Sequence, residues 1–177
     1  MLSELQLQIY AEQMLLDYDS INPGTIFKDK IRISIEDALR IQSAVADLRK
    51  KRGEEVAGYK IGCISKKTQI NMGLIKPAWG RLWKNELYRD GVLLKKDNYS
   101  NPAIEAEFGI MVNRDLPPDL ANFDYIKNSV ESVYPVIEIH NYVFKGGSPF
   151  GAELLANNAL HAGVVLGKFN DGTIINK

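Results

Sequence analysis

Apolar and polar residues alternate along AIEAEFGIMV, residues 103–112. Because successive side chains of a β-strand point to opposite faces, this alternation predicts a strand. Glu105 and Glu107 share one face, and the opposite face is apolar. The apolar face consists of Ile104, Ala106, Phe108, Ile110 and Val112. Since segments typical of buried strands follow along the chain, we expect the acidic face to line water, a cleft or a cation.

The two glutamates of this strand have a spacing that suits a shared metal ion. Side chains at positions i and i+2 of a strand leave the same face about 6.5 to 7 Å apart at the backbone, so both carboxylates can converge on one ion. The alternative is a solvated polar face on an edge strand, which is the commoner explanation of an arbitrary Glu-x-Glu pair.

A third glutamate, Glu138, lies in the apolar segment VYPVIEIHNY, residues 133–142. A buried carboxylate without a partner either takes up a proton or is energetically costly, so we expect a cation beside it. That cation is either a divalent metal ion or a lysine or arginine from elsewhere in the chain. If Glu105, Glu107 and Glu138 act together, three carboxylates suit Mg²⁺, Mn²⁺ or Ca²⁺ better than zinc, which usually takes histidine and cysteine ligands.

Lys60 is the candidate catalytic residue. It lies in GYKIG, residues 58–62, in a predicted strand whose glycines allow close packing. A partly desolvated lysine can bind a carboxylate or exchange a proton, although an exposed surface lysine is the commoner outcome. Two interpretations of His140 stay open, support of a metal ligand and a satisfied core histidine, while His161 and Cys63 are interpreted as packing residues.

Periodicity and turn residues predict the other elements. We expect two amphipathic helices before residue 53, the first ending before Asp19 and the second capped by Ser34. Short apolar segments bounded by turn residues predict further strands. The remaining expectations are a strand at residues 56–63, short helices at 65–72 and 123–130, a strand at 133–140, a glycine-rich loop at 145–151, a brief helix at 154–157 and a strand at 162–166.

The composition indicates one globular domain. The chain has 177 residues and equal numbers of basic and acidic residues, 22 of each. This balance disfavours nucleic acid and anionic membranes as partners. One cysteine excludes an intramolecular disulfide, and no apolar run has the pattern of a signal peptide or reaches the ~20 residues of a membrane span. We therefore expect a cytoplasmic protein.

Five segments, taken in order, resemble the 2-keto-4-pentenoate hydratase family of the fumarylacetoacetate hydrolase superfamily. They are GYKIG, PAWGRL, IEAEFGIMVNRDLP, YPVIEI and GAELLANNA, and the resemblance covers about residues 34–168. It implies that Glu105, Glu107 and Glu138 hold Mg²⁺ or Mn²⁺ and that Lys60 is the active-site lysine. It also implies a hydro-lyase that adds water to a 2-oxo or 2-hydroxy-dienoic acid, with relatives that decarboxylate 4-oxalocrotonate or hydrolyse acylpyruvates.

The sequence departs from the family pattern at three places. Ala78 follows Pro77 where many hydratases have an acidic residue. Asn141 begins a segment that replaces the acid-Ser-Arg sequence often found after the third glutamate. The chain stops at Lys177, whereas the family continues with strands and loops that complete the barrel, so the C-terminal part is expected to be lacking.

We therefore predict a mixed α/β fold in a single domain, residues 1–177, with a helical region at 1–53 and a β-rich region with the metal site at 54–177. The β-rich region is expected to be an incomplete version of the superfamily's barrel. The predicted function is a Mg²⁺-dependent hydratase acting on 2-hydroxypenta-2,4-dienoate or a related 2-oxo acid. The alternatives are a related decarboxylase or acylpyruvate hydrolase, or a shortened inactive homologue that binds a metal or ligand or serves as an assembly subunit. Unpaired strand edges favour a homo-oligomer or an assembly with a complete paralogue.

Overall fold

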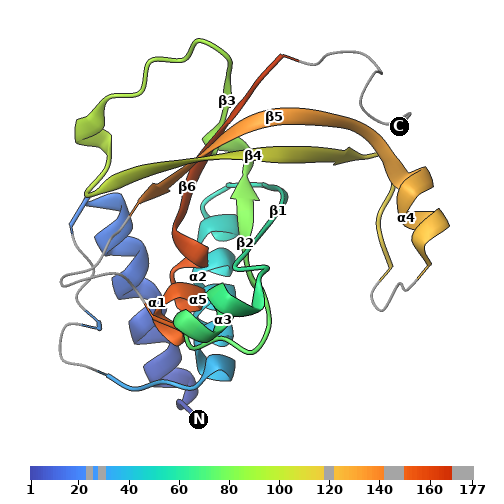
Figure 1. Ribbon diagram of the computed structural model, residues 1–177. Helices are drawn as coiled ribbons and strands as arrows, with labels where there is room; N and C mark the ends of the chain where they lie inside the picture. Colours follow the sequence, from blue (N-terminus) through green and yellow to red (C-terminus); the bar gives the residue numbers. More distant parts are fainter. Residues whose placement is uncertain (23–25, 28–30, 118–121, 142–149, 169–177) are drawn as a thin grey trace.

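The protein combines a cluster of helices with a long twisted sheet (Figure 1). The computed structural model describes residues 1–22, 26–27, 31–117, 122–141 and 150–168. The helices are α1 (Glu4–Asp19), α2 (Ile35–Lys51), α3 (Lys66–Asn71), α4 (Phe123–Ser129) and α5 (Ala152–Ala156). The strands are β1 (Val56–Gly62), β2 (Ala78–Trp83), β3 (Leu87–Arg89), β4 (Pro102–Val112), β5 (Val130–Asn141) and β6 (His161–Leu166). Short 3-10 turns are η1 (Lys84–Glu86), η2 (Lys96–Asn98) and η3 (Asn158–Leu160).

The two long helices begin at serine caps. Ser3 and Gln6 form a capping box at the start of α1. The side chain of Ser34 accepts a hydrogen bond from the backbone N–H of Asp37 at 3.0 Å, so the predicted cap of α2 is confirmed. The first helix continues through Asp19, one residue past its predicted limit, because its last backbone hydrogen bonds extend to Ser20.

The main hydrophobic core lies among α1, α2 and α5. Ala38 and Ile41 of α2 are fully buried and belong to one cluster with Leu154 and Leu155 of α5. The amide of Gln42 donates to the carbonyl of Leu155 at 2.8 Å and to that of Trp79 at 3.1 Å, so α2 is fastened to both α5 and β2. This cluster fixes the β1–β2 hairpin against the helices.

The strands form two sheets. β1 pairs antiparallel with β2, and a four-stranded sheet has the order β3-β6-β5-β4. In the larger sheet β6 is parallel to β3 and antiparallel to β5, and β5 is antiparallel to β4. The described strands of this sheet do not close into a barrel, and β4 lies at one edge. The predicted mixed α/β class with an open, β-rich region is confirmed.

The apolar face of β4 is exposed, although the alternation of the sequence suggests that this face is buried. Ile104, Phe108 and Ile110 are 71%, 74% and 61% exposed. The acidic face instead turns toward the β1–β2 hairpin, because the carboxylate of Glu138, which pairs with Glu105 across the strands, contacts Lys60 of β1. The polar face of this strand is therefore the inward one.

The other elements lie close to their predicted positions. The predicted strands at 56–63, 133–140 and 162–166 correspond to β1, β5 and β6, and the predicted short helices correspond to α3, α4 and α5. The glycine-rich loop at 145–151 lies almost entirely outside the described residues. Among the described residues, no helix is both long enough and apolar enough to cross a membrane.

Candidate metal centre

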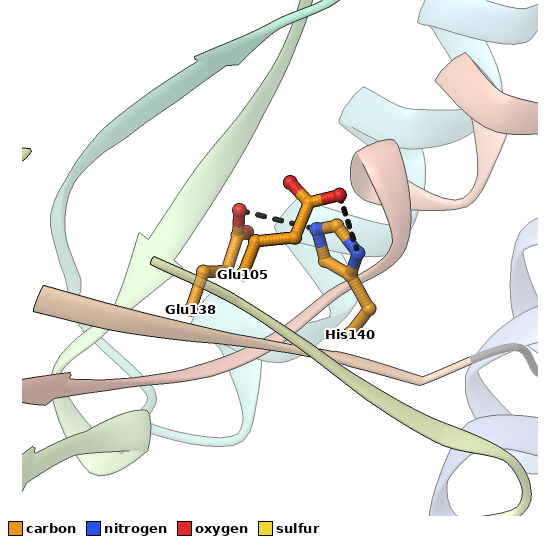
Figure 2. A group of neighbouring side chains, drawn as sticks. All are labelled: Glu105, Glu138 and His140. Carbon is orange, nitrogen blue, oxygen red and sulfur yellow. Dashed lines mark ion pairs between the residues drawn. The ribbon is translucent and has the colours of Figure 1, made fainter. Parts of the chain in front are cut away.

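The candidate site begins with a cross-strand pair of carboxylates. Glu105 of β4 lies opposite Glu138 of β5, and His140 follows two residues later on the same face of β5. Figure 2 shows these three side chains side by side. Each offers one nitrogen or oxygen atom, and these three atoms lie within 4.8 Å of one another. The antiparallel register of β4 and β5 therefore creates the group.

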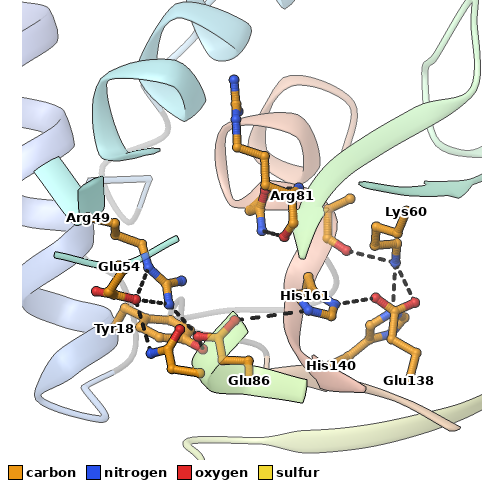
Figure 3. A network of polar contacts seen from close by, with 12 residues as sticks. Tyr18, Arg49, Glu54, Lys60, Arg81, Glu86, Glu138, His140 and His161 are labelled. Carbon is orange, nitrogen blue, oxygen red and sulfur yellow. Dashed lines mark hydrogen bonds and ion pairs between the residues drawn. The ribbon is translucent and has the colours of Figure 1, made fainter. Parts of the chain in front are cut away.

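Lys60 reaches the same group from the β1–β2 hairpin (Figure 3). Its ammonium Nζ donates to Glu138 Oε2 at 2.6 Å and lies 3.1 Å from His140 Nε2 and 3.4 Å from the carbonyl oxygen of Ala159. The residue is only 9% exposed. The structure thus favours the partly desolvated lysine over the exposed surface lysine that is common in such sequences.

Glu138 is an ionised carboxylate in a buried position. It is 1% exposed, and burial by itself would raise its pKa. Hydrogen bonds from His140 and His161, together with the charge of Lys60, outweigh burial and lower the pKa of Glu138 well below its ordinary value. Lys60 is a lysine partner of the kind that the sequence left open as an alternative to a metal ion.

Glu107 lies next to this group but outside it. It shares the inward face of β4 with Glu105 and pairs with Val136 rather than with a polar residue. Burial raises the pKa of the Glu107 carboxyl above its ordinary value, and the negative charge of Glu138 adds to the rise. Its predicted role as a metal ligand stays a prediction, because the set of converging ligand atoms in the described residues contains His140 in its place.

His161 is a site residue that sequence reasoning missed. Its side chain is fully buried, and its Nδ1 lies 2.8 Å from Glu138 Oε1. The interpretation of His161 as a packing residue is therefore incomplete. A one-residue register shift between β5 and β6 makes His161 the partner of His140, so that both histidines share the face of Glu138.

The residues present fit a divalent cation of the hard type. Three carboxylates, those of Glu105, Glu107 and Glu138, lie on this face, and the ammonium of Lys60 pairs with one of them, Glu138. Carboxylate oxygens are the preferred ligands of Mg²⁺ and Ca²⁺, and an imidazole nitrogen is accepted by Mn²⁺ as well.

Comparison with known proteins finds hydratases among the proteins of similar sequence. No protein-family profile matches the chain. The chain is 30% identical to a 2-oxo-hept-4-ene-1,7-dioate hydratase of Escherichia coli over 146 residues, which are 78% of this chain and 54% of that protein. It is 31% identical to a 2-keto-4-pentenoate hydratase of Burkholderia vietnamiensis over 130 residues, covering 73% of this chain and 50% of that protein.

A solved structure resembles the whole described fold. The 4-oxalocrotonate decarboxylase from Pseudomonas putida G7, complexed with magnesium and adipate, has a TM-score of 0.88 at 20% sequence identity, covering 96% of this chain and 65% of that one. The fold is thus the one seen in that decarboxylase. In sequence the chain is similar to 2-keto-4-pentenoate hydratases, and it spans about half the length of the curated relatives it matches.

Proposed function

We propose that this protein is a divalent-metal-dependent hydratase that adds water to 2-hydroxypenta-2,4-dienoate or a related 2-oxo acid. The observation that carries the proposal is the convergence of Glu105, Glu138 and His140 on one point, with Lys60 beside them and Glu107 on the same strand face. Hydratases of 2-oxo and 2-hydroxy-dienoic acids among the relatives support the choice of reaction.

The proposed ligands are Glu105, Glu107 and Glu138, and the proposed ion is Mg²⁺ or Mn²⁺. His140 is an additional donor that the geometry offers. When bound, a divalent cation supplies positive charge that stabilises the negative charge developing on the oxygen of a 2-oxo acid. The relative crystallised with magnesium and the one crystallised with calcium support a hard cation.

Lys60 is the proposed proton carrier. Its ammonium lies in a buried position against Glu138 and is held by the carbonyl of Ala159, so its Nζ points at the carboxylate cluster. From that position Nζ can hold or move a proton, or orient the carboxylate of a substrate. Since Ala78 replaces an acidic residue of many hydratases, Lys60 is the proton-carrying side chain on which the proposal depends.

A second candidate reaction is decarboxylation of a 2-oxo diacid such as 4-oxalocrotonate. It is favoured by the fold similarity to a 4-oxalocrotonate decarboxylase and by the 25% identity with another decarboxylase of this name. Both reactions place negative charge on the same oxygen of a 2-oxo acid, so the same residues would serve either one. A small oxoacid is the proposed substrate class in both cases.

The free Cys63 also supports our proposal of a reducing, cytoplasmic location.

The test combines metal binding with turnover. Calorimetric titration with Mn²⁺ should show one site. Residues that only support a metal ligand typically change metal affinity by about tenfold or more when they are replaced, so Glu107→Ala and Glu138→Ala, which remove proposed ligands, should each lower Mn²⁺ affinity by more than about tenfold. Glu131→Ala is the matched control, because Glu131 is an exposed glutamate on the same strand as Glu138. Turnover is followed by loss of dienoate absorbance with and without chelator.

The outcomes separate the candidates. Loss of dienoate that needs added Mg²⁺ or Mn²⁺ supports the hydratase, and release of carbon dioxide from 4-oxalocrotonate supports the decarboxylase. Activity that a chelator leaves untouched would reject the metal mechanism. Metal binding without turnover on dienoates, oxalocrotonate and acylpyruvates would favour an inactive homologue that serves as a binding or assembly subunit.

A further inference from the structure

His161 lies between two buried carboxylates that come from different parts of the fold (Figure 3). Its Nδ1 is 2.8 Å from Glu138 Oε1, and its Nε2 is 4.0 Å from Glu86 Oε2. Glu138 belongs to the candidate metal centre, whereas Glu86 belongs to the 3-10 turn before β3. The imidazole therefore lies between the candidate metal centre and a second polar group, which consists of Glu86 and its partners Tyr18 and Arg49.

The polar group on the far side of His161 is well anchored. Glu86 Oε1 accepts hydrogen bonds from Arg49 Nη2 at 2.6 Å and from the hydroxyl of Tyr18 at 3.1 Å. The guanidinium of Arg49 lies over the ring of Trp83, 4.2 Å from its centroid, and also binds Glu54. Glu86 is thus held in place by α1 and α2, and its second oxygen is left to face His161.

The backbone places His161 in this position at some cost. Three consecutive residues before β6, Asn158, Ala159 and Leu160, have positive φ values of 51°, 50° and 66°, which side chains other than glycine rarely adopt. The register shift at the start of β6 then turns His161 onto the face of Glu138. Strained backbone of this kind persists where the surrounding structure requires it, and it clusters at functional sites.

The proton positions follow from the partners. The Nδ1 of His161 lies 2.8 Å from Glu138 Oε1, and the same carboxylate accepts a hydrogen bond from the Lys60 ammonium at 2.6 Å, so we assign the proton of the histidine contact to Nδ1. With Oε1 held in this way, Oε2 is the oxygen that meets Lys60 at 2.6 Å and His140 at 3.1 Å. The two oxygens of Glu138 therefore have separate partners.

We propose that His161 is a positioning residue: its Nδ1–H fixes Glu138 Oε1, so that Oε2 is presented to Lys60 and to the metal ion. This inference rests on the proposed function, because it assigns His161 a role at that metal centre. Hydrogen bonds that orient a ligating group typically change metal affinity by about 10- to 100-fold when they are removed. A histidine that only filled space would have no such effect.

Matched variants separate the two roles of the imidazole. An asparagine amide reaches the position of an imidazole Nδ1, and a glutamine amide reaches the position of Nε2. We expect His161→Leu and His161→Gln to weaken Mn²⁺ binding about tenfold or more, and His161→Asn to restore most of the affinity. Urea unfolding of each variant confirms that it is folded. Equal Mn²⁺ affinity of folded His161→Asn and His161→Gln would overturn the proposal.

A second measurement on the wild-type protein needs neither metal nor turnover. The chain has two histidines, so long-range ¹⁵N–¹H correlation spectra contain two imidazoles, and the one that remains in His140→Gln is that of His161. We expect a proton on Nδ1 of His161, and an unprotonated Nδ1 would overturn the proposal. If the wild type binds no Mn²⁺, the proposed function fails, whereas the spectrum still decides the role of His161.

Discussion

The ammonium of Lys60 pairs with a carboxylate that is also a proposed metal ligand. It lies 2.6 Å from Glu138, so a metal ion bound there would share the negative charge of this carboxylate with the lysine. Two cations beside one anion repel each other, so in the proposed site Lys60 would weaken metal binding while it serves as the proton carrier. Under the proposed function, the pairing of Lys60 with Glu138 would therefore separate metal binding from catalysis.

Replacing Lys60 by methionine tests this separation. Lys60→Met keeps a long apolar side chain and removes one positive charge, so we expect unchanged or tighter Mn²⁺ binding. Turnover should fall by at least about 100-fold, the usual contribution of a positioned proton carrier. Lys84→Met is the control, because Lys84 is an exposed lysine that pairs with Glu55 away from the site. A parallel loss of binding and turnover would assign Lys60 a structural role instead.

Individual residues of the site differ in how far sequence reveals them. Glu105 and Glu107 follow from strand alternation, and Glu138 follows from a charge in an apolar segment, because both signals lie within a few neighbouring residues. His161 has no such local signal. Its contact with Glu138 spans 23 residues and depends on a register shift that no single segment encodes. Side-chain direction after a bulge is set by pairing between strands, which sequence periodicity does not report.

The corner between α2 and β1 is held by one carboxylate. Glu54 accepts hydrogen bonds from Arg49 at 2.8 Å and from Asn85 at 3.2 Å, and it also binds Arg52. Burial raises the pKa of Glu54, but the hydrogen bonds from Arg49 and Arg52 outweigh it, so the pKa lies below its ordinary value. A carboxylate of this kind stabilises the fold above its unfolded-state pKa, and that stabilisation is lost as the pH falls through the folded-state pKa.

The corner should therefore weaken in acid. We expect the free energy of unfolding of the wild type to fall as the pH drops below about 4.5, and this fall to be shallower in Glu54→Gln. Urea denaturation across this range provides the measurement. Glu55→Gln is the matched control, since Glu55 is the exposed neighbour whose partner is Lys84. Identical acid profiles for Glu54→Gln and wild type would show that the ion pairs at this corner contribute nothing to stability.

The helices and strands follow their local signals, but the orientation of β4 does not. Ser34 caps α2 as predicted, and the alternation at residues 103–112 does form a strand. Alternation defines two faces without stating which one is inward. The inward face of β4 is the one that it shares with Glu138 of the paired strand β5, and Glu138 contacts Lys60 of β1 and His161 of β6, which are distant in sequence. The apolar side chains of β4 are left outward as a result.

This outward face leads us to expect self-association. Ile104, Phe108 and Ile110 form an exposed apolar row on a strand that also has an unpaired edge in the described sheet. Exposed apolar patches and free strand edges favour protein contacts, and a second copy of the chain is the simplest partner that closes such a surface. Light scattering at micromolar concentration should therefore give at least the mass of a dimer.

A charged residue in the exposed apolar row of β4 should dissociate the expected dimer. We expect Phe108→Lys to shift the protein toward a monomer, because a dimer would then bury an unpaired charge. Phe123→Lys is the control, as Phe123 is equally exposed but lies on α4. A wild type that is a monomer at micromolar concentration, or an equal response to both substitutions, would count against an interface on β4.

The contacts of Lys60 have a consequence for the order in which the protein is made and folded. Its partners Glu138, His140 and Ala159 lie 78, 80 and 99 residues further along the chain. His161, which contacts Glu138, comes later still. A ribosome must therefore release nearly all of the described chain before any of these groups can meet. Since such distant contacts form late, a metal ion would find its ligands assembled only in the folded protein. A bound ion would therefore slow unfolding and would leave the rate of folding nearly unchanged.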